Sequence, residues 1–157
     1  MGFEKTLEKE KKFSYDGTLD VQDFINFLKK ALKKRGYEHK EKVYTTAKDP
    51  SGKKTIFIIW EVTKNLDEYH KSKMEWKCAF LNLKEKAKLS EGSFNYEAKL
   101  VLEFDKEDEW TKSSYKAFLR HFYDKFAKKK ENDKLEQEVK DDLEYFIEQM
   151  KKYTASK

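Results

Sequence analysis

This chain has little proline, cysteine, glycine or arginine. Its 157 residues include one proline, one cysteine and five glycines. Because the single cysteine, Cys78, cannot form an internal disulfide, the fold is not a disulfide-stapled scaffold, and a reducing cytoplasmic location is expected. No Pro- or Gly-rich linker interrupts the chain, so we expect one domain over residues 1–157, frayed at 1–10 and 154–157.

Long apolar runs and catalytic motifs are also missing. No run approaches the roughly 20 residues that cross a bilayer, so we expect a soluble protein without a transmembrane segment. The three histidines, His39, His70 and His121, lie far apart and outside any metal-ligand spacing, and there is no Gly-rich phosphate loop or GxSxG motif. We therefore predict no catalytic residues, metal or cofactor, and a protein that is not an enzyme.

The charge is high but mixed in sign. Thirty-five basic residues against thirty acidic ones give a net charge of +5, and only Arg35 and Arg120 are arginines. Lysine is a poor bidentate reader of phosphates and bases, which makes nucleic acid an unfavoured partner. Two basic clusters nevertheless form a candidate patch for phosphates or anionic headgroups, and the same clusters also suit the negative ends of helix dipoles; their members are Lys33, Lys34, Arg35, Lys128, Lys129 and Lys130.

Aromatic residues, by contrast, are abundant, at 15% of the chain, and hydrophobic periodicity predicts an α+β fold. A helix is expected over residues 18–36, with Asp20 near its start and Gly36 at its end. Asp49-Pro50-Ser51-Gly52 is typical of a turn that joins two antiparallel strands.

The expected element order is β-α-β-β-β-β-α-α, with four or five strands in one antiparallel sheet and three helices packed on it. A short strand covers 11–17, and a turn at 90–93 joins the last two strands. The last two helices cover 113–126 and a segment that begins at Asp133, with Glu136 in capping-box position.

The stretch Thr55–Val62, TIFIIWEV, has apolar residues on both faces of its strand. Together with the neighbouring strands it predicts a second apolar patch on the sheet, formed by Phe57, Ile59, Ala79, Leu81 and Val101. A solvated sheet face does not need such a patch. We expect the last helix of the chain to cover it, and a second copy or another protein, or a lipid, ligand or membrane, are the alternatives.

The order of elements resembles the helix-grip arrangement of START and Bet v 1-like proteins. That resemblance implies a hydrophobic ligand enclosed between a curved sheet and the last helix. The chain also resembles small uncharacterised Lys/Glu-rich archaeal proteins, in Trp60-Glu61, in Asp67 to Tyr69 and in Phe118 to Phe126. This second resemblance implies no activity.

Three functions follow as expectations. The leading one is a non-enzymatic binding or structural module that acts through protein–protein contact or self-association, with a partner patch at Phe57, Ile59, Leu81 and Val101. The second is a carrier of a hydrophobic small molecule or lipid, with a binding site lined by Trp60, Trp76, Phe94 and Tyr96. The third is a peripheral binder of anionic membranes or nucleic acid through the lysine clusters.

Overall fold

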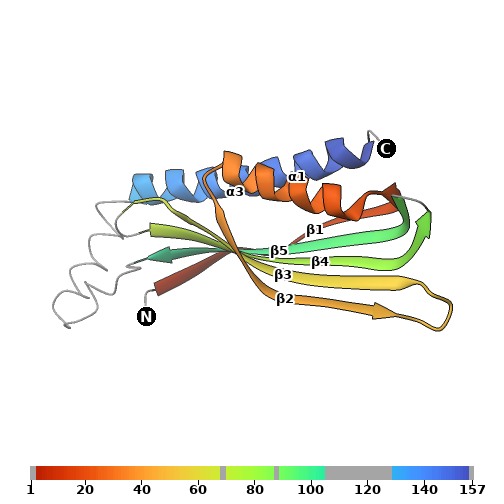
Figure 1. Ribbon diagram of the computed structural model, residues 1–157. Coiled ribbons are helices and arrows are strands. Elements are labelled where there is room, and N and C mark those ends of the chain that lie inside the picture. Colours follow the sequence, from red (N-terminus) through yellow and green to blue (C-terminus); the bar gives the residue numbers. More distant parts are fainter. Residues whose placement is uncertain (1–2, 68–69, 87–88, 105–128, 156–157) are drawn as a thin grey trace.

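The structure, a computed structural model, describes residues 3–67, 70–86, 89–104 and 129–155 (Figure 1). Within them the α+β class and the antiparallel sheet are confirmed. The described elements are β1 (Phe3–Leu19), α1 (Val21–Lys34), β2 (Glu38–Lys48), β3 (Lys54–Asn65), β4 (His70–Lys86), β5 (Leu89–Phe104) and α3 (Lys129–Ala155). The described part of the chain thus contains two helices and not three, and the helix expected over 113–126 lies outside it.

The five strands form one sheet in the order β1-β5-β4-β3-β2, and every neighbouring pair is antiparallel. The first and last of the described strands, β1 and β5, are therefore neighbours, and β1 and β2 form the two edges. Strand β1 begins at Phe3, well before the predicted start at Lys11, so residues 3–10 are not a frayed lead-in. Its charged sequence hides this strand, because an edge strand can pair through its backbone without a continuous apolar alternation.

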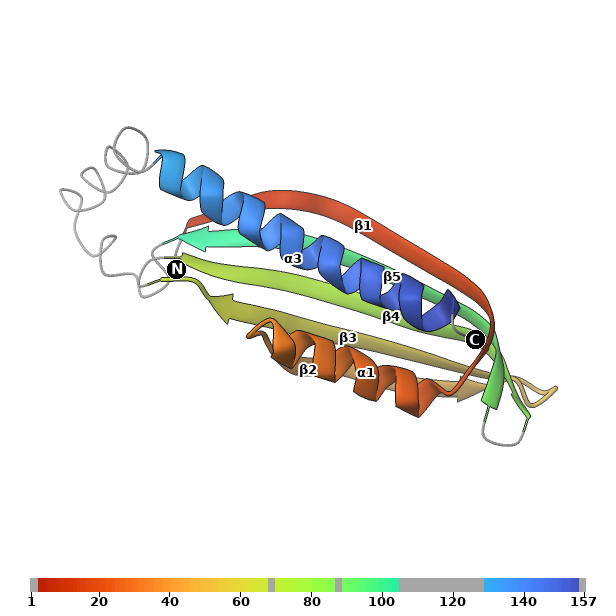
Figure 2. The same ribbon diagram turned by 90° about the horizontal axis from the view of Figure 1, so that it is seen from above.

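Both helices lie on the same face of the sheet, as the side view and the view from above show (Figures 1 and 2). Helix α1 buries the stripe that its periodicity predicts, and the Asp20 side chain accepts a hydrogen bond of 3.0 Å from the Asp23 backbone N–H at its start. Gly36 follows the helix with φ +81°, the left-handed conformation expected of a glycine stop.

Helix α3 also packs on this face, where Val139, Leu143, Phe146, Ile147 and Met150 are all buried. The helix begins at Lys129, ahead of the predicted start at Asp133, and it continues to Ala155. Thr154 is buried and its hydroxyl donates to the Met150 carbonyl at 3.0 Å, so the expected fraying is wrong for this residue.

The turn between β2 and β3 is confirmed. The Gly52 N–H donates to the Asp49 carbonyl at 3.0 Å, and the Asp49 carboxylate accepts from the backbone of Ser51 and Lys53 at 2.9 Å each. Gly52 has φ +88°. Glycine suits this position because its backbone adopts a positive φ at little cost.

The turn between β4 and β5 differs from the prediction. Strand β4 continues to Lys86, which pairs with Leu89 of β5, and residues 90–93 continue strand β5. Gly92 fits there because β4 is irregular between Leu81 and Lys84, and a Cβ on Gly92 would lie 2.6 Å from the Leu81 carbonyl oxygen. This glycine permits a close approach of two strands, which sequence alone does not distinguish from a turn.

Candidate binding surface

The two faces of the central strands differ in what covers them. Along β3 and β4 buried and half-buried residues alternate, and the buried ones face the helices. The opposite side, called here the open face, has no described element lying against it (Figure 1). The expectation that the last helix covers the second apolar patch is therefore wrong, because α3 shares the face of α1.

Four half-buried apolar side chains form a patch on the open face: Phe57, Ile59, Ala79 and Leu81. Phe57 stands opposite Ala79, and Ile59 lies two residues along the same strand. This set is called the open-face patch. It borders a depression of about 300 Å³, lined by Phe57 and Ala79 and by polar side chains that include Lys12, Ser14, Lys77 and Glu97. The predicted partner residues Phe57, Ile59 and Leu81 thus lie together.

Val101, the fifth residue of the predicted patch, lies apart from the other four. It stands opposite Lys73, whereas Ala79 stands opposite Asn95. A hairpin turn at 90–93 would bring Ala79 near Val101, but Lys86 pairs with Leu89, and this pairing shifts the register of β5. Val101 is 7% exposed and does not belong to the main hydrophobic core.

Charges on the open face are balanced. On β4 and β5, Lys71 stands opposite Glu103, Glu75 opposite Lys99, and Lys77 opposite Glu97. Such cross-strand pairs of opposite charge stabilise a sheet by about 0.2–1 kcal/mol each. They also leave the face without the excess positive charge that a nucleic acid or an anionic membrane requires.

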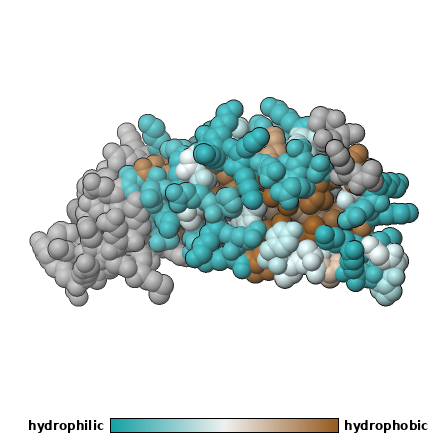
Figure 3. Space-filling view, in the orientation of Figure 1, coloured by the Kyte–Doolittle hydropathy of each residue, from teal (hydrophilic) through white to brown (hydrophobic). Residues whose placement is uncertain are grey.

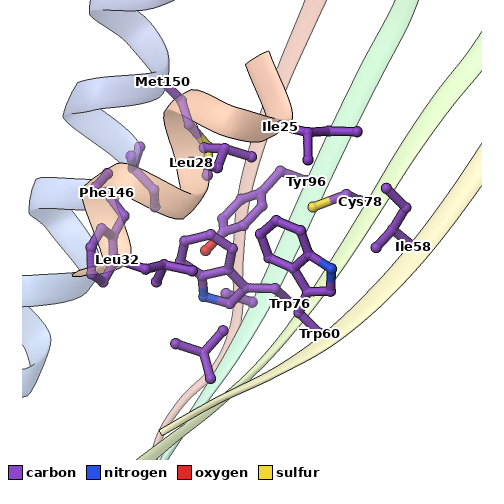
Figure 4. Close-up of a cluster of buried hydrophobic side chains, with 14 of the residues drawn as sticks. Ile25, Leu28, Leu32, Ile58, Trp60, Trp76, Cys78, Tyr96, Phe146 and Met150 are labelled. Carbon is purple, nitrogen blue, oxygen red and sulfur yellow. The ribbon is translucent and has the colours of Figure 1, made fainter. Parts of the chain in front are cut away.

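The predicted ligand-lining residues lie on the other side, in the interior between the sheet and the helices. Trp60, Trp76, Phe94 and Tyr96 are each at most 2% exposed. Figure 4 shows Trp60, Trp76 and Tyr96 packed beneath α1 and α3. The Trp76 ring contacts Tyr96 and Phe146 edge-on, with centroids 5.2 and 5.3 Å apart. Trp76 thus contacts Trp60, Tyr96 and Phe146 of α3, whereas Phe94 packs against Phe24 and Phe80.

Two of the polar groups in this interior have partners and one does not. The Trp60 indole N–H donates to Glu41 at 3.3 Å, and that of Trp76 contacts the Met74 sulfur at 3.4 Å. Among the described residues, the buried Tyr96 hydroxyl has no hydrogen-bond partner. Burial, with a smaller contribution from Cys78, raises the pKa of Tyr96 well above its usual value.

A buried polar cluster, which sequence reasoning missed, joins α3 to the sheet. The Tyr37 hydroxyl lies 2.9 Å from Asp142 Oδ2 and 3.1 Å from Ser72 Oγ. Asp142 is 3% exposed, and Arg35 and Lys64 approach its carboxylate at 3.5 and 3.7 Å. Asp142 occupies a buried position on α3 beside buried apolar residues. A charged residue within the apolar stripe of a helix is the feature of the sequence that could have indicated this cluster.

Buried His70 and exposed Asp67 form a second polar contact, just before β4. His70 Nδ1 lies 2.8 Å from the Asp67 carboxylate, which also accepts from the His70 backbone N–H at 2.7 Å. Because one carboxylate binds both the ring and the backbone of the same residue, this contact fixes the local turn.

The lysine clusters are only partly described. Lys33 and Lys34 are exposed in the last turn of α1, while Arg35 contacts Asp142 and lies 3.9 Å from the Tyr145 ring centroid. Lys128 lies outside the described residues. Lys129 and Lys130 are the first residues of α3, so they sit at the positive end of that helix and not at the C-terminal end of another.

The described residues contain neither a metal-binding cluster nor a membrane-spanning helix. No group of three or more His, Cys, Asp or Glu side chains is arranged to hold a metal ion in the part of the chain that is described. Within the same part, neither helix has the length and apolar character needed to cross a membrane.

Comparison with known proteins gives no relative. The chain matches no protein-family model, no curated protein and no solved structure at a significant level.

Proposed function

We propose that the protein is a non-enzymatic binding module that contacts another protein through the open face of its sheet. The observation that carries this proposal is the position of the open-face patch. Phe57, Ile59 and Leu81 lie on the face opposite both described helices, beside a depression with polar walls. An apolar centre with a polar rim is the usual anatomy of a protein interface.

The charge pattern favours a protein over the other partners. The open face carries lysine and glutamate in opposed pairs, which suit a surface of mixed charge. The exposed lysines of α1 lie on the helix side of the sheet, away from this face. A partner that binds through net charge alone would not prefer the open face, because the charges on that face are balanced.

The test replaces the patch residue on the central strand β4 that has a large side chain, Leu81→Lys. We expect the variant to fold and to lose the partner that co-purifies with tagged wild-type protein from the cells that make it. Leu81 is half-buried and lies on the face opposite the helices. The substitution should therefore lower the free energy of unfolding, measured by urea denaturation, by no more than about 1 kcal/mol. Circular dichroism and quantitative mass spectrometry of the eluted proteins are the measurements.

Asn26→Lys is the matched control, because it adds the same charge on the exposed side of α1. It should retain the partner. Retention by Leu81→Lys would place the contact elsewhere, and unfolding of Leu81→Lys would show that the open-face patch is ordinary core.

A second candidate is the carrier of a hydrophobic ligand. The buried Tyr96 hydroxyl favours it, because a hydroxyl in an apolar interior is stabilised by a hydrogen-bond partner, and the polar group of a ligand could provide one. Helix α3 lies across the sheet over this residue, as the helix-grip resemblance implies. Native mass spectrometry tests this candidate, since a bound ligand adds its mass to the protein, and Tyr96→Phe should then release it.

A further inference from the structure

The outer edge of β2 is protected unevenly. Edge strands expose unpaired backbone N–H and C=O groups, and proteins shield them with charges and bulges. Charged residues occupy β2 from Glu38 to Lys42 and again at Lys48, and a register shift falls between Glu41 and Val43. Between them lies the segment Val43–Ala47, called here the edge segment, with five uncharged residues and regular pairing to β3.

The edge segment combines exposure with strong strand-forming residues. Its sequence, Val-Tyr-Thr-Thr-Ala, contains three β-branched residues and one aromatic residue, which favour strands. All its residues except half-buried Val43 are exposed, and the Tyr44 side chain is 50% exposed. Figure 3 shows pale and brown surface over the lower right side, where Figure 1 draws β2.

The open-face patch reaches the edge of the sheet at this segment. Thr45 stands opposite Phe57, and Val43 stands opposite Ile59. The cross-strand rows that contain Phe57 and Ile59 therefore end at the edge segment, the uncharged stretch of β2. A continuation of the sheet at this point would extend the patch without opposing any like charges within the segment.

We infer that two copies of the protein pair through their edge segments, antiparallel, with Thr45 on the two-fold axis. Thr45 then stands opposite its own copy, Tyr44 opposite Thr46 of the second copy, and Val43 opposite Ala47 of the second copy. This inference rests on the proposed function, since it makes the binding surface a single face shared by two open-face patches.

The side-chain directions satisfy this register. Opposed residues in an antiparallel pair must project from the same face. Val43, Thr45 and Ala47 stand opposite open-face positions of β3, and Tyr44 and Thr46 stand opposite buried Ile58 and Ile56. Each proposed pair therefore lies on one face, and the exposed Tyr44 ring gains a β-branched neighbour twice per dimer.

A second copy fits this edge better than other partners do. The flanks of the edge segment carry both signs in equal number, with Glu41 and Lys42 before it and Lys48 and Asp49 after it. They provide no net field for an acidic or basic peptide. A second copy supplies a strand that is uncharged over the same length. The like charges that this register opposes, Lys42 and Lys48 of the second copy, lie outside the edge segment, and Lys42 already pairs with Glu61 at 3.2 Å.

The two-fold position of Thr45 gives a test that other interfaces would not pass. Thr45→Lys and Thr45→Glu each place like charges opposite each other, so each variant alone should dimerise about fivefold more weakly than wild type. An equimolar mixture, with one variant labelled with ¹⁵N, should instead form the mixed dimer above its statistical share in native mass spectrometry. Added salt should reduce that excess.

Ser14→Lys is the control. Ser14 is exposed on β1 at the other end of the same cross-strand row, through Phe57, Ala79 and Asn95, so it should leave the dimer unchanged. The inference is overturned if wild-type protein sediments as a monomer at about 1 mM. It is also overturned if the mixture shows no excess of the mixed dimer, or if Ser14→Lys weakens the dimer as much as Thr45→Lys does.

The two proposals fail separately. Leu81→Lys should keep the dimer and lose the partner protein, whereas Thr45→Lys should weaken the dimer and keep a Leu81-dependent contact with that partner. A dimer that is lost in Leu81→Lys and kept in Thr45→Lys would place self-association on the open face. That result would overturn the edge pairing and leave the binding function of the open face in place.

Discussion

At the scale of single residues, Cys78 shows how burial removes reactivity. It is 3% exposed on the helix-facing side of β4, and burial raises its pKa to about 12. Cys78 alternates along β4 with Trp76 and Phe80, which are also buried, so it is a small residue of the hydrophobic core. The thiolate is the reactive form of cysteine, so both its accessibility and its concentration are low.

We therefore expect native protein to react with a thiol reagent such as DTNB only as fast as it unfolds. The measurement is the absorbance change at about pH 8, where an unperturbed cysteine with a pKa of roughly 8.5 is partly ionised. Protein unfolded in urea is the control and should react at once. Rapid labelling of the native protein would contradict the buried position of Cys78.

At the scale of elements, the attachment of α3 depends on polar contacts as well as on apolar ones. Its buried stripe packs on the sheet, while Asp142 binds the Tyr37 hydroxyl and two cations from other elements. Lys11 of β1 adds an exposed ion pair to Glu144 at 2.5 Å. A surface pair of this kind contributes at most about 1 kcal/mol, so Asp142 is the stronger polar anchor.

Asp142→Ala should lower the free energy of unfolding by about 2–3 kcal/mol, because it leaves the Tyr37 hydroxyl and the nearby cations without their carboxylate. Urea denaturation measures the loss, and hydrogen exchange along α3 should rise. Asp141→Ala is the matched control, since Asp141 is exposed and its carboxylate contacts only Gln137 among the hydrogen bonds described. Equal losses in both variants would contradict the anchoring role.

The elements also differ in how well the sequence predicts them. Helix α1 and the turn at Asp49–Gly52 were predictable, because caps and turn residues act locally. The face that α3 covers was not, because its apolar stripe fits either face of the sheet equally well. The register of β5 was missed for a related reason: Gly92 marks a close approach between strands that is decided by tertiary contacts.

The candidate surface was predictable to a similar extent. Alternation placed Phe57, Ile59 and Leu81 on one face, which required only the period of a strand. Val101 was misplaced because its position depends on the hairpin turn. The Tyr37–Asp142 contact joins residues far apart in the chain, so no local pattern could indicate it.

At the scale of the whole molecule, two phenols, one buried and one half-buried, link stability to pH. Burial is the main cause that raises the pKa of Tyr37 and of Tyr153, and contacts with Asp142 and Asp23 raise them further. An unfolded phenol ionises near pH 10. Because these phenols stay protonated in the folded protein above that pH, their contribution to stability is complete below about pH 10 and is lost as pH rises beyond it.

We expect the urea midpoint of wild-type protein to fall above about pH 10 more steeply than that of Tyr37→Phe. The variant should be less stable at about pH 8, by roughly 1 kcal/mol for the lost hydrogen bond, and the two curves should converge as pH rises. Lysines titrate in both proteins, so the comparison isolates Tyr37. Parallel curves would show that Tyr37 ionises alike in the folded and unfolded states.

The pairing of β1 with β5 sets an order on the synthesis of the chain. Residues 3–19 leave the ribosome before residues 89–104, which form the one strand beside them in the described part of the chain. Strand β1 must therefore remain unpaired while α1 and strands β2, β3 and β4 are made. An apolar strand in that condition would aggregate, because exposed strand edges pair with other chains. Unpaired β1 contains five consecutive charged residues, Glu8 to Lys12, which favour hydration over pairing with other chains. The same charges that make β1 hard to predict from sequence therefore oppose aggregation of the nascent chain.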